Sequence, residues 1–181
     1  MKQVKWFDWD FAYKPHQNLL PSILERLAGT PGRLEEKLAS MPAEVLTRRV
    51  DATWSIKENV GHLTDCEPLW QGRLEDILTG KTELRPTDLQ NSKTFLANHN
   101  ATLTDKLIAG FRHARAQTVQ LIAALDEKDV LKSALHPRLK SPMRALDLAL
   151  FVVEHDDHHL ARMSELGRLI YGGGQRYGDF W

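Results

Sequence analysis

The chain has 181 residues, of which 42% are hydrophobic and 27% charged, a composition typical of a globular protein. Lysine plus arginine and aspartate plus glutamate each number 24, so no excess positive charge favours nucleic-acid binding. The single cysteine, Cys66, excludes an intrachain disulfide, and no apolar run reaches the ~18 residues of a membrane span. The N-terminus lacks a signal peptide's apolar region, so we expect one cytoplasmic domain over 1–181 with no membrane partner.

The first half of the chain begins with an irregular, aromatic segment at 1–18, which we interpret as an arm packed on the domain. Apolar residues then follow at helical spacing over 21–41, interrupted by the sequence G-T-P-G at 29–32. This interruption predicts a short helix followed by a second one. Thr30 would be the N-cap of the second helix, and Pro31 would lie in its first turn.

The strongest helix prediction begins at Ser55. Ser55 and Glu58 form the S-x-x-E pattern of a capping box, in which each side chain accepts a hydrogen bond from the other residue's backbone. Apolar residues follow at helical spacing: Ile56, Val60, Leu63, Trp70, Leu74 and Ile77. Pro68 lies inside this segment, and Gly80 is placed to end the helix.

A polar segment at 81–101 separates this helix from the next one, over about 103–125. Connections of this length are uncommon without a function or structure of their own, so we expect a lid or crossover with a short helix. The Ser-Pro pair at 141–142 begins the last long helix, and the aromatic tail at 171–181 is expected to fold back on the protein. No strand pattern is found. The sequence therefore predicts an all-α four-helix bundle with a long crossover connection.

One face of the last predicted helix is apolar except for two histidines. Steps of four and three residues place on it Leu148, Val152, His155, His159, Met163, Leu166 and Ile170. Because His155 and His159 are one turn apart, with Cβ atoms roughly 5–6 Å from each other, both imidazoles can bind one metal ion. The alternative is a pair of structural histidines at the core edge. His158 lies on a different face.

A catalytic metal usually needs a third protein ligand, and His62 is the best candidate. It lies at the edge of the apolar stripe of a helix that can face the last one in a bundle. Three unpaired buried imidazoles would be costly, and a shared metal would remove that cost. By itself, a histidine in this position is more often structural. Four other histidines have no partner at ligand spacing: His16, His99, His113 and His136.

Several neighbouring residues have two interpretations each. Cys66 lies one helical turn after His62, so it could approach the metal or serve as a small buried apolar residue. Asp65, Asp156 and Asp157 could orient an imidazole or lie at the surface. The sequence H-D-D-H-H at 155–159 is similar to the H-E-x-x-H of zinc peptidases. Aspartate is one methylene shorter than glutamate, however, and no downstream ligand fits, which disfavours a peptidase.

Three motifs in this order, WSIKENVGHL, HPRLKSPM and EHDDHHLARM, resemble the DinB-like (DinB/YfiT) superfamily over roughly residues 20–170. The resemblance implies a four-helix bundle with three metal-binding histidines, one on the second helix and two in H-x3-H on the last. They match His62, His155 and His159. The superfamily pattern W-S-x-x-E-x-x-x-H, whose last residue corresponds to His62, is also present in this sequence.

The resemblance implies a class of activity. Similar members include enzymes that use a divalent metal to activate a low-molecular-weight thiol such as bacillithiol or mycothiol. We therefore expect a metal-dependent hydrolase or thiol S-transferase acting on a small electrophile, with zinc or nickel favoured and a thiol as a further cofactor. The alternatives are a non-catalytic metal-stabilised binding or structural protein, and a helical interaction module without metal. Similar members form homodimers, which the apolar helix faces permit here.

Overall fold

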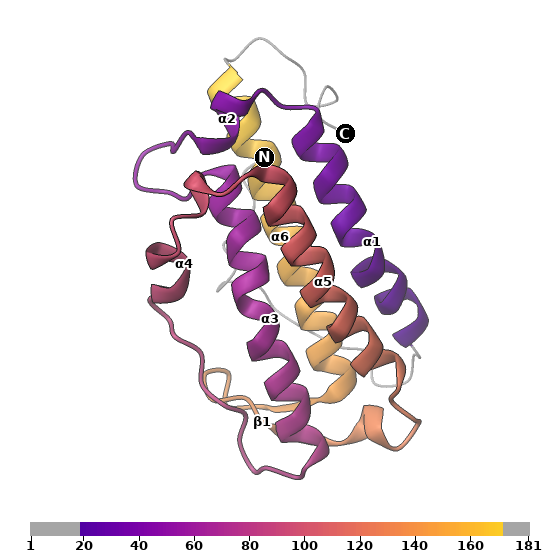
Figure 1. The fold of residues 1–181 in the computed structure, drawn as a ribbon. Helices are drawn as coiled ribbons and strands as arrows, with labels where there is room; N and C mark the ends of the chain where they lie inside the picture. Colours follow the sequence, from indigo (N-terminus) through magenta and orange to yellow (C-terminus); the bar gives the residue numbers. More distant parts are fainter. Residues whose placement is uncertain (1–18, 172–181) are drawn as a thin grey trace.

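A computed structural model describes residues 19–171, which form a bundle of four long helices (Figure 1). These helices are α1 (Leu20–Ala39), α3 (Ile56–Leu78), α5 (Thr104–Ala123) and α6 (Ala145–Tyr171). The short helix α2 (Ala43–Thr47) joins α1 to α3. Helices α1 and α6 run in one direction along the bundle, and α3 and α5 run in the other. The predicted four-helix bundle is confirmed, whereas the arm at 1–18 and the tail beyond Tyr171 lie outside the described residues.

The connection between α3 and α5 returns along the bundle because these neighbouring helices are parallel (Figure 1). It contains the predicted short helix, α4 (Ser92–Leu96), and the 3-10 helix η2 (His99–Ala101). Two glycines of α3 allow the connection to lie close. A Cβ atom on Gly61 would lie 2.2 Å from the His99 ring, and one on Gly72 would lie 2.0 Å from the Arg85 guanidinium. The crossover is therefore packed directly onto α3.

Helix α1 is continuous, so the prediction of two helices over 21–41 was wrong. Pro31 lies inside the helix, and Thr30 is not an N-cap. Instead, the Thr30 hydroxyl donates a hydrogen bond to Asp156 Oδ2 of α6 at 2.9 Å. The buried face of α1 continues on both sides of the interruption, with Leu27 before it and Leu34 after it. Packing of this continuous face outweighs the local cost of proline and glycine within a helix.

The last helix begins at Ala145, not at the Ser-Pro pair at 141–142 as predicted. Strand β2 (Pro142–Arg144) precedes it and pairs antiparallel with β1 (Ser133–Leu135), after the 3-10 helix η3 (Asp129–Leu131). The Asp147 carboxylate accepts the backbone N–H of the residue before the helix at 3.0 Å, which is one half of a capping box. Three-residue strands are too short to show the alternation by which a strand is recognised, so the sequence analysis missed both.

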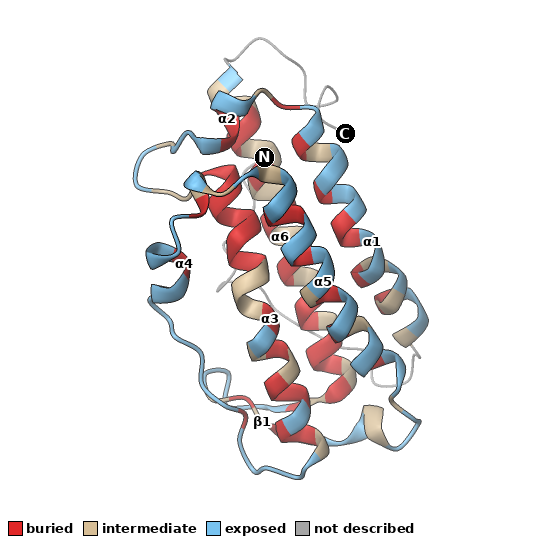
Figure 2. Cartoon of the chain, viewed as in Figure 1, coloured by how far each residue is buried: buried red, intermediate tan, exposed pale blue. Residues whose placement is uncertain are grey.

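The core consists of two apolar clusters that follow each other along the bundle. One contains Trp70 and Phe151, and the other contains Phe111 and Met163. Figure 2 shows that the buried residues occupy the faces that the helices turn toward one another. Between the two clusters every long helix contributes at least one buried polar residue, including Thr30, Glu67, Arg115 and Asp156. We refer to these four residues, together with Thr118, as the polar layer.

Arg115 is the only cation of the polar layer and is 1% exposed. Its Nε donates to Glu67 Oε1 at 2.8 Å, and its Nη2 donates to Asp156 Oδ1 at 3.0 Å. The Thr118 hydroxyl donates to Glu67, and the Thr30 hydroxyl donates to Asp156. Because every charge in the layer has hydrogen-bond partners, the cost of removing these groups from water is offset. The layer thereby holds all four helices in one register.

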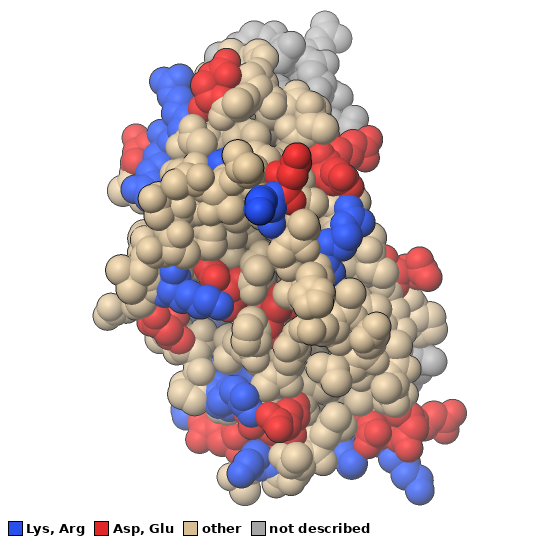
Figure 3. All heavy atoms as spheres, viewed as in Figure 1, with Lys and Arg blue, Asp and Glu red and all other residues tan. Residues whose placement is uncertain are grey.

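Charged side chains of both signs are interspersed over the face of the bundle in Figure 3. Some of them pair between helices, as Arg33 does with Asp157 at 2.7 Å and Arg112 with Glu35 at 2.6 Å. Among residues 19–171, no helix has both the length and the apolar character needed to cross a membrane.

The polar layer makes a prediction about stability. Substituting Arg115→Ala leaves Glu67 and Asp156 buried without their cation, so we expect the free energy of unfolding to fall by about 3–5 kcal/mol. Arg112→Ala, on the exposed face of the same helix, should lower it by less than about 1 kcal/mol. Urea denaturation of both variants measures the difference. Equal losses in the two variants would contradict a central role for the layer.

Candidate metal centre

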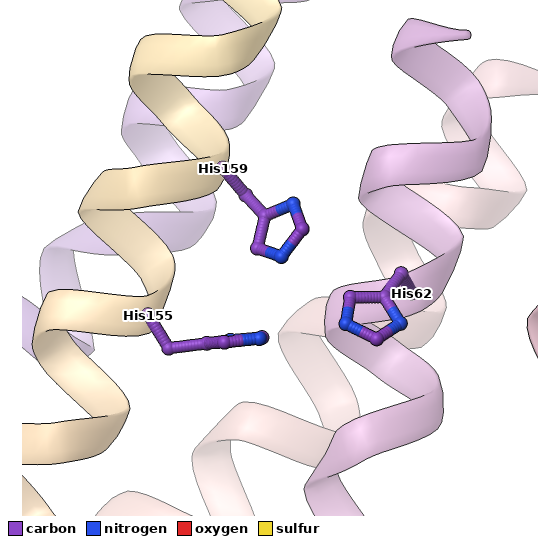
Figure 4. Close-up of side chains that lie close together, drawn as sticks. All are labelled: His62, His155 and His159. Carbon is purple, nitrogen blue, oxygen red and sulfur yellow. The ribbon is translucent and has the colours of Figure 1, made fainter. Parts of the chain in front are cut away.

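Helices α3 and α6 bring His62, His155 and His159 together. Each residue offers a side-chain nitrogen, and these atoms all lie within 4.8 Å of one another. Figure 4 shows the imidazoles of His155 and His159 on α6 pointing across to His62 on α3. The ring centroids of the two α6 histidines lie 5.3 Å and 4.9 Å from that of His62. All three side chains are buried, so the structure assembles the group that the sequence analysis selected.

Burial keeps the three imidazoles uncharged. It lowers the pKa of His62 to about 4. It also lowers the pKa values of His155 and His159 well below the ordinary histidine value, and repulsion from neighbouring imidazoles adds to this effect. At neutral pH each ring therefore has one nitrogen with a free lone pair, which is the form that binds a metal. Three neutral imidazoles converging on one point fit the donor set of a divalent ion.

Asn59 orients His159. The side-chain oxygen of Asn59 lies 2.8 Å from His159 Nδ1 and accepts its hydrogen, which leaves Nε2 as the nitrogen available to a metal ion. The Asn59 amide nitrogen donates to the Ser55 carbonyl at 2.8 Å, so the amide has a defined orientation. The Trp54 ring stacks on the His159 ring, with centroids 6.3 Å apart. The sequence analysis missed Asn59, whose position three residues before His62 was the available signal.

The crossover connection orients His62. The Thr94 hydroxyl donates to Asp65 Oδ2 at 2.9 Å, so its oxygen is left to accept from His62 Nδ1 at 3.2 Å. Asp65 also lies 2.8 Å from His99 Nε2. The His99 ring can lie this close to α3 because Gly61 has no side chain. Asp65 therefore supports an imidazole indirectly, through Thr94. His99, to which the sequence analysis assigned no partner at ligand spacing, belongs to this support.

The other two aspartates proposed to orient an imidazole have different partners. Asp156 belongs to the polar layer, and Asp157 forms ion pairs with Arg26 and Arg33 at the surface. The Cys66 sulfur lies 3.5 Å from His62 Nε2, and burial raises the pKa of this thiol to about 12. A thiol that stays protonated at neutral pH fits the interpretation of Cys66 as a small packing residue.

The three histidines line a pocket of about 490 Å³, a volume suited to a small molecule. Its walls come from α3, α6, the crossover and the loop between the two strands, including segments 86–89 and 136–138. Arg138 of that loop and the crossover are both placed to contact a small molecule in the pocket. His158, expected on a different face, also lines it, with its ring 5.4 Å from that of His159.

Comparison with known proteins shows which family the chain belongs to. The model of the DinB superfamily matches residues 26–163. The chain belongs to the DinB superfamily. Among relatives of this DinB-superfamily chain is YfiT of Bacillus subtilis, named provisionally as a metal-dependent hydrolase. It is 26% identical over 168 residues, which cover 86% of this chain and 90% of YfiT.

A solved structure of YfiT from Bacillus subtilis shows the same fold. It superposes with a TM-score of 0.74 at 23% sequence identity, covering 88% of this chain and 94% of the other. That structure is described as a four-helix bundle of unusual topology. In this DinB-superfamily chain, α3 and α5 are parallel and are joined by a long crossover.

The buried histidines make stability depend on pH. In the metal-free protein, we expect the free energy of unfolding to fall as the pH is lowered from about 6.5 to about 4.5. Unfolded histidines bind protons near pH 6.5, whereas the pKa of buried His62 is about 4 and those of His155 and His159 lie well below the ordinary value. The unfolded state therefore takes up more protons in this window, at up to about 1.4 kcal/mol per pH unit for each histidine.

Urea denaturation of chelator-treated protein at several pH values measures this slope. The variant His62→Gln should flatten it, and His113→Gln, at an exposed position, should leave it unchanged. Equal stability at about pH 5 and about pH 7 would show that the three imidazoles are not held neutral by burial.

Proposed function

We propose that this protein is a metal-dependent hydrolase acting on a small molecule, with His62, His155 and His159 holding one divalent ion. The observation that carries the proposal is the convergence of three neutral, buried imidazoles on one wall of a small-molecule pocket. The provisional name of the relative YfiT points to the same class of activity. A divalent ion held by neutral ligands supplies a Lewis acid that lowers the pKa of a bound water or thiol.

The residues around the triad have distinct roles in this proposal. Asn59 and Thr94 present the imidazoles in a single tautomer and orientation, which raises affinity for the ion. Trp70 and Phe151 form an apolar wall with ring centroids 5.8 Å apart. This wall excludes water beside the triad, so charge interactions there are stronger than in solution. The ligand set favours zinc or nickel, since imidazole suits both.

A finer alternative is transfer of a low-molecular-weight thiol to an electrophile at the same site. The raised pKa of Cys66 supports the view that the thiolate for such a reaction would come from a second small molecule. Addition of a thiol separates the two activities, because hydrolysis does not require it. In a non-catalytic metal-stabilised protein, neither added thiol nor azide would reach the ion. The cytoplasmic location and the homodimer stay predictions from the sequence.

Metal content tests the proposal directly. Protein purified without a histidine tag should contain about one divalent ion per chain, as a single three-histidine site requires. The variant His155→Ala/His159→Ala should contain none, and His158→Ala should keep it. Mass spectrometry measures the metal, and ester and amide panels, with and without added thiol, measure activity. Wild-type protein that takes up no zinc, nickel or manganese would exclude the site.

A second prediction concerns the support of His159. Substituting Asn59→Ala removes the acceptor at Nδ1, so we expect metal affinity to fall by about 10–100-fold. Competition with a chromogenic chelator measures the affinity. Thr64→Ala is the matched control, because this residue lies on the same helix and its hydroxyl donates to the Val60 carbonyl. Unchanged affinity in a folded Asn59→Ala variant would show that this contact does not support the ligand.

A further inference from the structure

A second buried arginine, Arg73 of α3, lines the same pocket and is 2% exposed. Its Nε donates to the backbone carbonyl of Arg85 at 3.1 Å, and its Nη1 lies 3.3 Å from His136 Nε2. Its Nη2 is buried and has no hydrogen-bond partner within residues 19–171. An unmet donor on a buried charged group is costly, so an acceptor from outside this part of the chain is expected.

Neither partner of Arg73 neutralises its charge. One is a peptide carbonyl, and the other is an imidazole whose pKa burial lowers to about 4. Asp76, on the same helix, accepts hydrogen bonds from Arg85 Nε at 2.9 Å and Nη2 at 2.8 Å. Burial lowers the pKa of Arg73 to about 10, so the guanidinium remains charged at neutral pH.

The contrast with Arg115 is informative. The two arginines are almost equally buried, and Arg115 has two carboxylate partners in the polar layer. Arg73, by contrast, faces a pocket whose lining includes a further arginine, Arg138. The carboxylate in that lining belongs to Asp88, whose two oxygens accept the backbone N–H groups of Gln90 and Ser92. Within the described residues, Arg73 therefore has no carboxylate partner in the pocket wall.

We propose that Arg73 binds a carboxylate group of the small molecule that occupies this pocket. The guanidinium edge formed by Nη1 and Nη2 matches the two oxygens of a carboxylate, and one cation balances one negative charge. The assignment of the molecule as the substrate rests on the proposed function, whereas the carboxylate contact itself does not. The ligand class is a small acid with an apolar middle.

The distances limit the length of this ligand. The Trp70 ring centroid lies 5.4 Å from that of His155, and the Arg73 guanidinium carbon lies 5.8 Å from the Trp70 ring. The guanidinium is therefore within about 11 Å of the His155 imidazole. A molecule whose carboxylate contacts Arg73 can reach the three histidines with its other end, passing the apolar wall of Trp70 and Phe151.

A matched pair of ligands tests the proposal on the full chain. Isothermal titration compares 5-phenylvalerate with its neutral twin 5-phenylvaleramide, for zinc-loaded and for chelator-treated protein. Wild type should bind the acid at least about tenfold more tightly than the amide in both forms, because hydrogen bonds to a charged group are strong. In Arg73→Met the two affinities should become equal, while Arg112→Met, at an exposed site, should keep the preference.

Two results would overturn the proposal: equal affinity of wild type for the acid and the amide, or a preference that persists in Arg73→Met. A preference seen only with zinc and retained in Arg73→Met would place the carboxylate at the metal, supporting the metal site while rejecting Arg73. A preference that depends on Arg73 in protein that takes up no metal would keep this inference and reject the proposed function. Circular dichroism checks folding, and Arg73→Gln replaces Arg73→Met if the latter does not fold.

Discussion

The bundle depends on one buried cation. Arg115 of α5 bonds Glu67 of α3 and Asp156 of α6, and Thr30 of α1 bonds the same aspartate. A charged layer has only one arrangement in which every group is paired, whereas apolar clusters above and below it could slide or rotate at less cost. Because Asp156 must face Arg115, its neighbour His155 is turned toward the pocket. The layer thus links the register of the helices to the geometry of the histidines.

The crossover connection completes the site that the helices begin. Parallel α3 and α5 require a connection as long as the bundle, and this connection supplies Thr94, one wall of the pocket and the Asp65 partner His99. Gly61 makes this possible, because any side chain there would displace the His99 ring. A segment that is long for topological reasons therefore also orients His62. Arg73, which lacks a carboxylate partner in the described residues, extends the chemistry of the pocket beyond the histidines.

Local and periodic signals in the sequence were sufficient for much of this protein. The capping box of Ser55 and Glu58 is present, and the helix that it starts ends at Leu78, two residues before Gly80 in a left-handed conformation. The period of the last helix placed His155 and His159 on one buried face, because a helix repeats every 3.6 residues whatever packs against it. The choice of His62 also required the helix order of a bundle and the resemblance to a known superfamily.

The tertiary structure decided what depends on contacts between distant segments. Continuous packing carries α1 through Pro31, and a hairpin of three-residue strands delays the start of α6. Asn59 and Thr94 acquire their roles only when α6 and the crossover meet α3, and no spacing along the chain encodes those meetings. The pairing of Arg115, and the incomplete pairing of Arg73, likewise depend on which carboxylates the fold brings within reach, since a charge is neutralised by proximity in space.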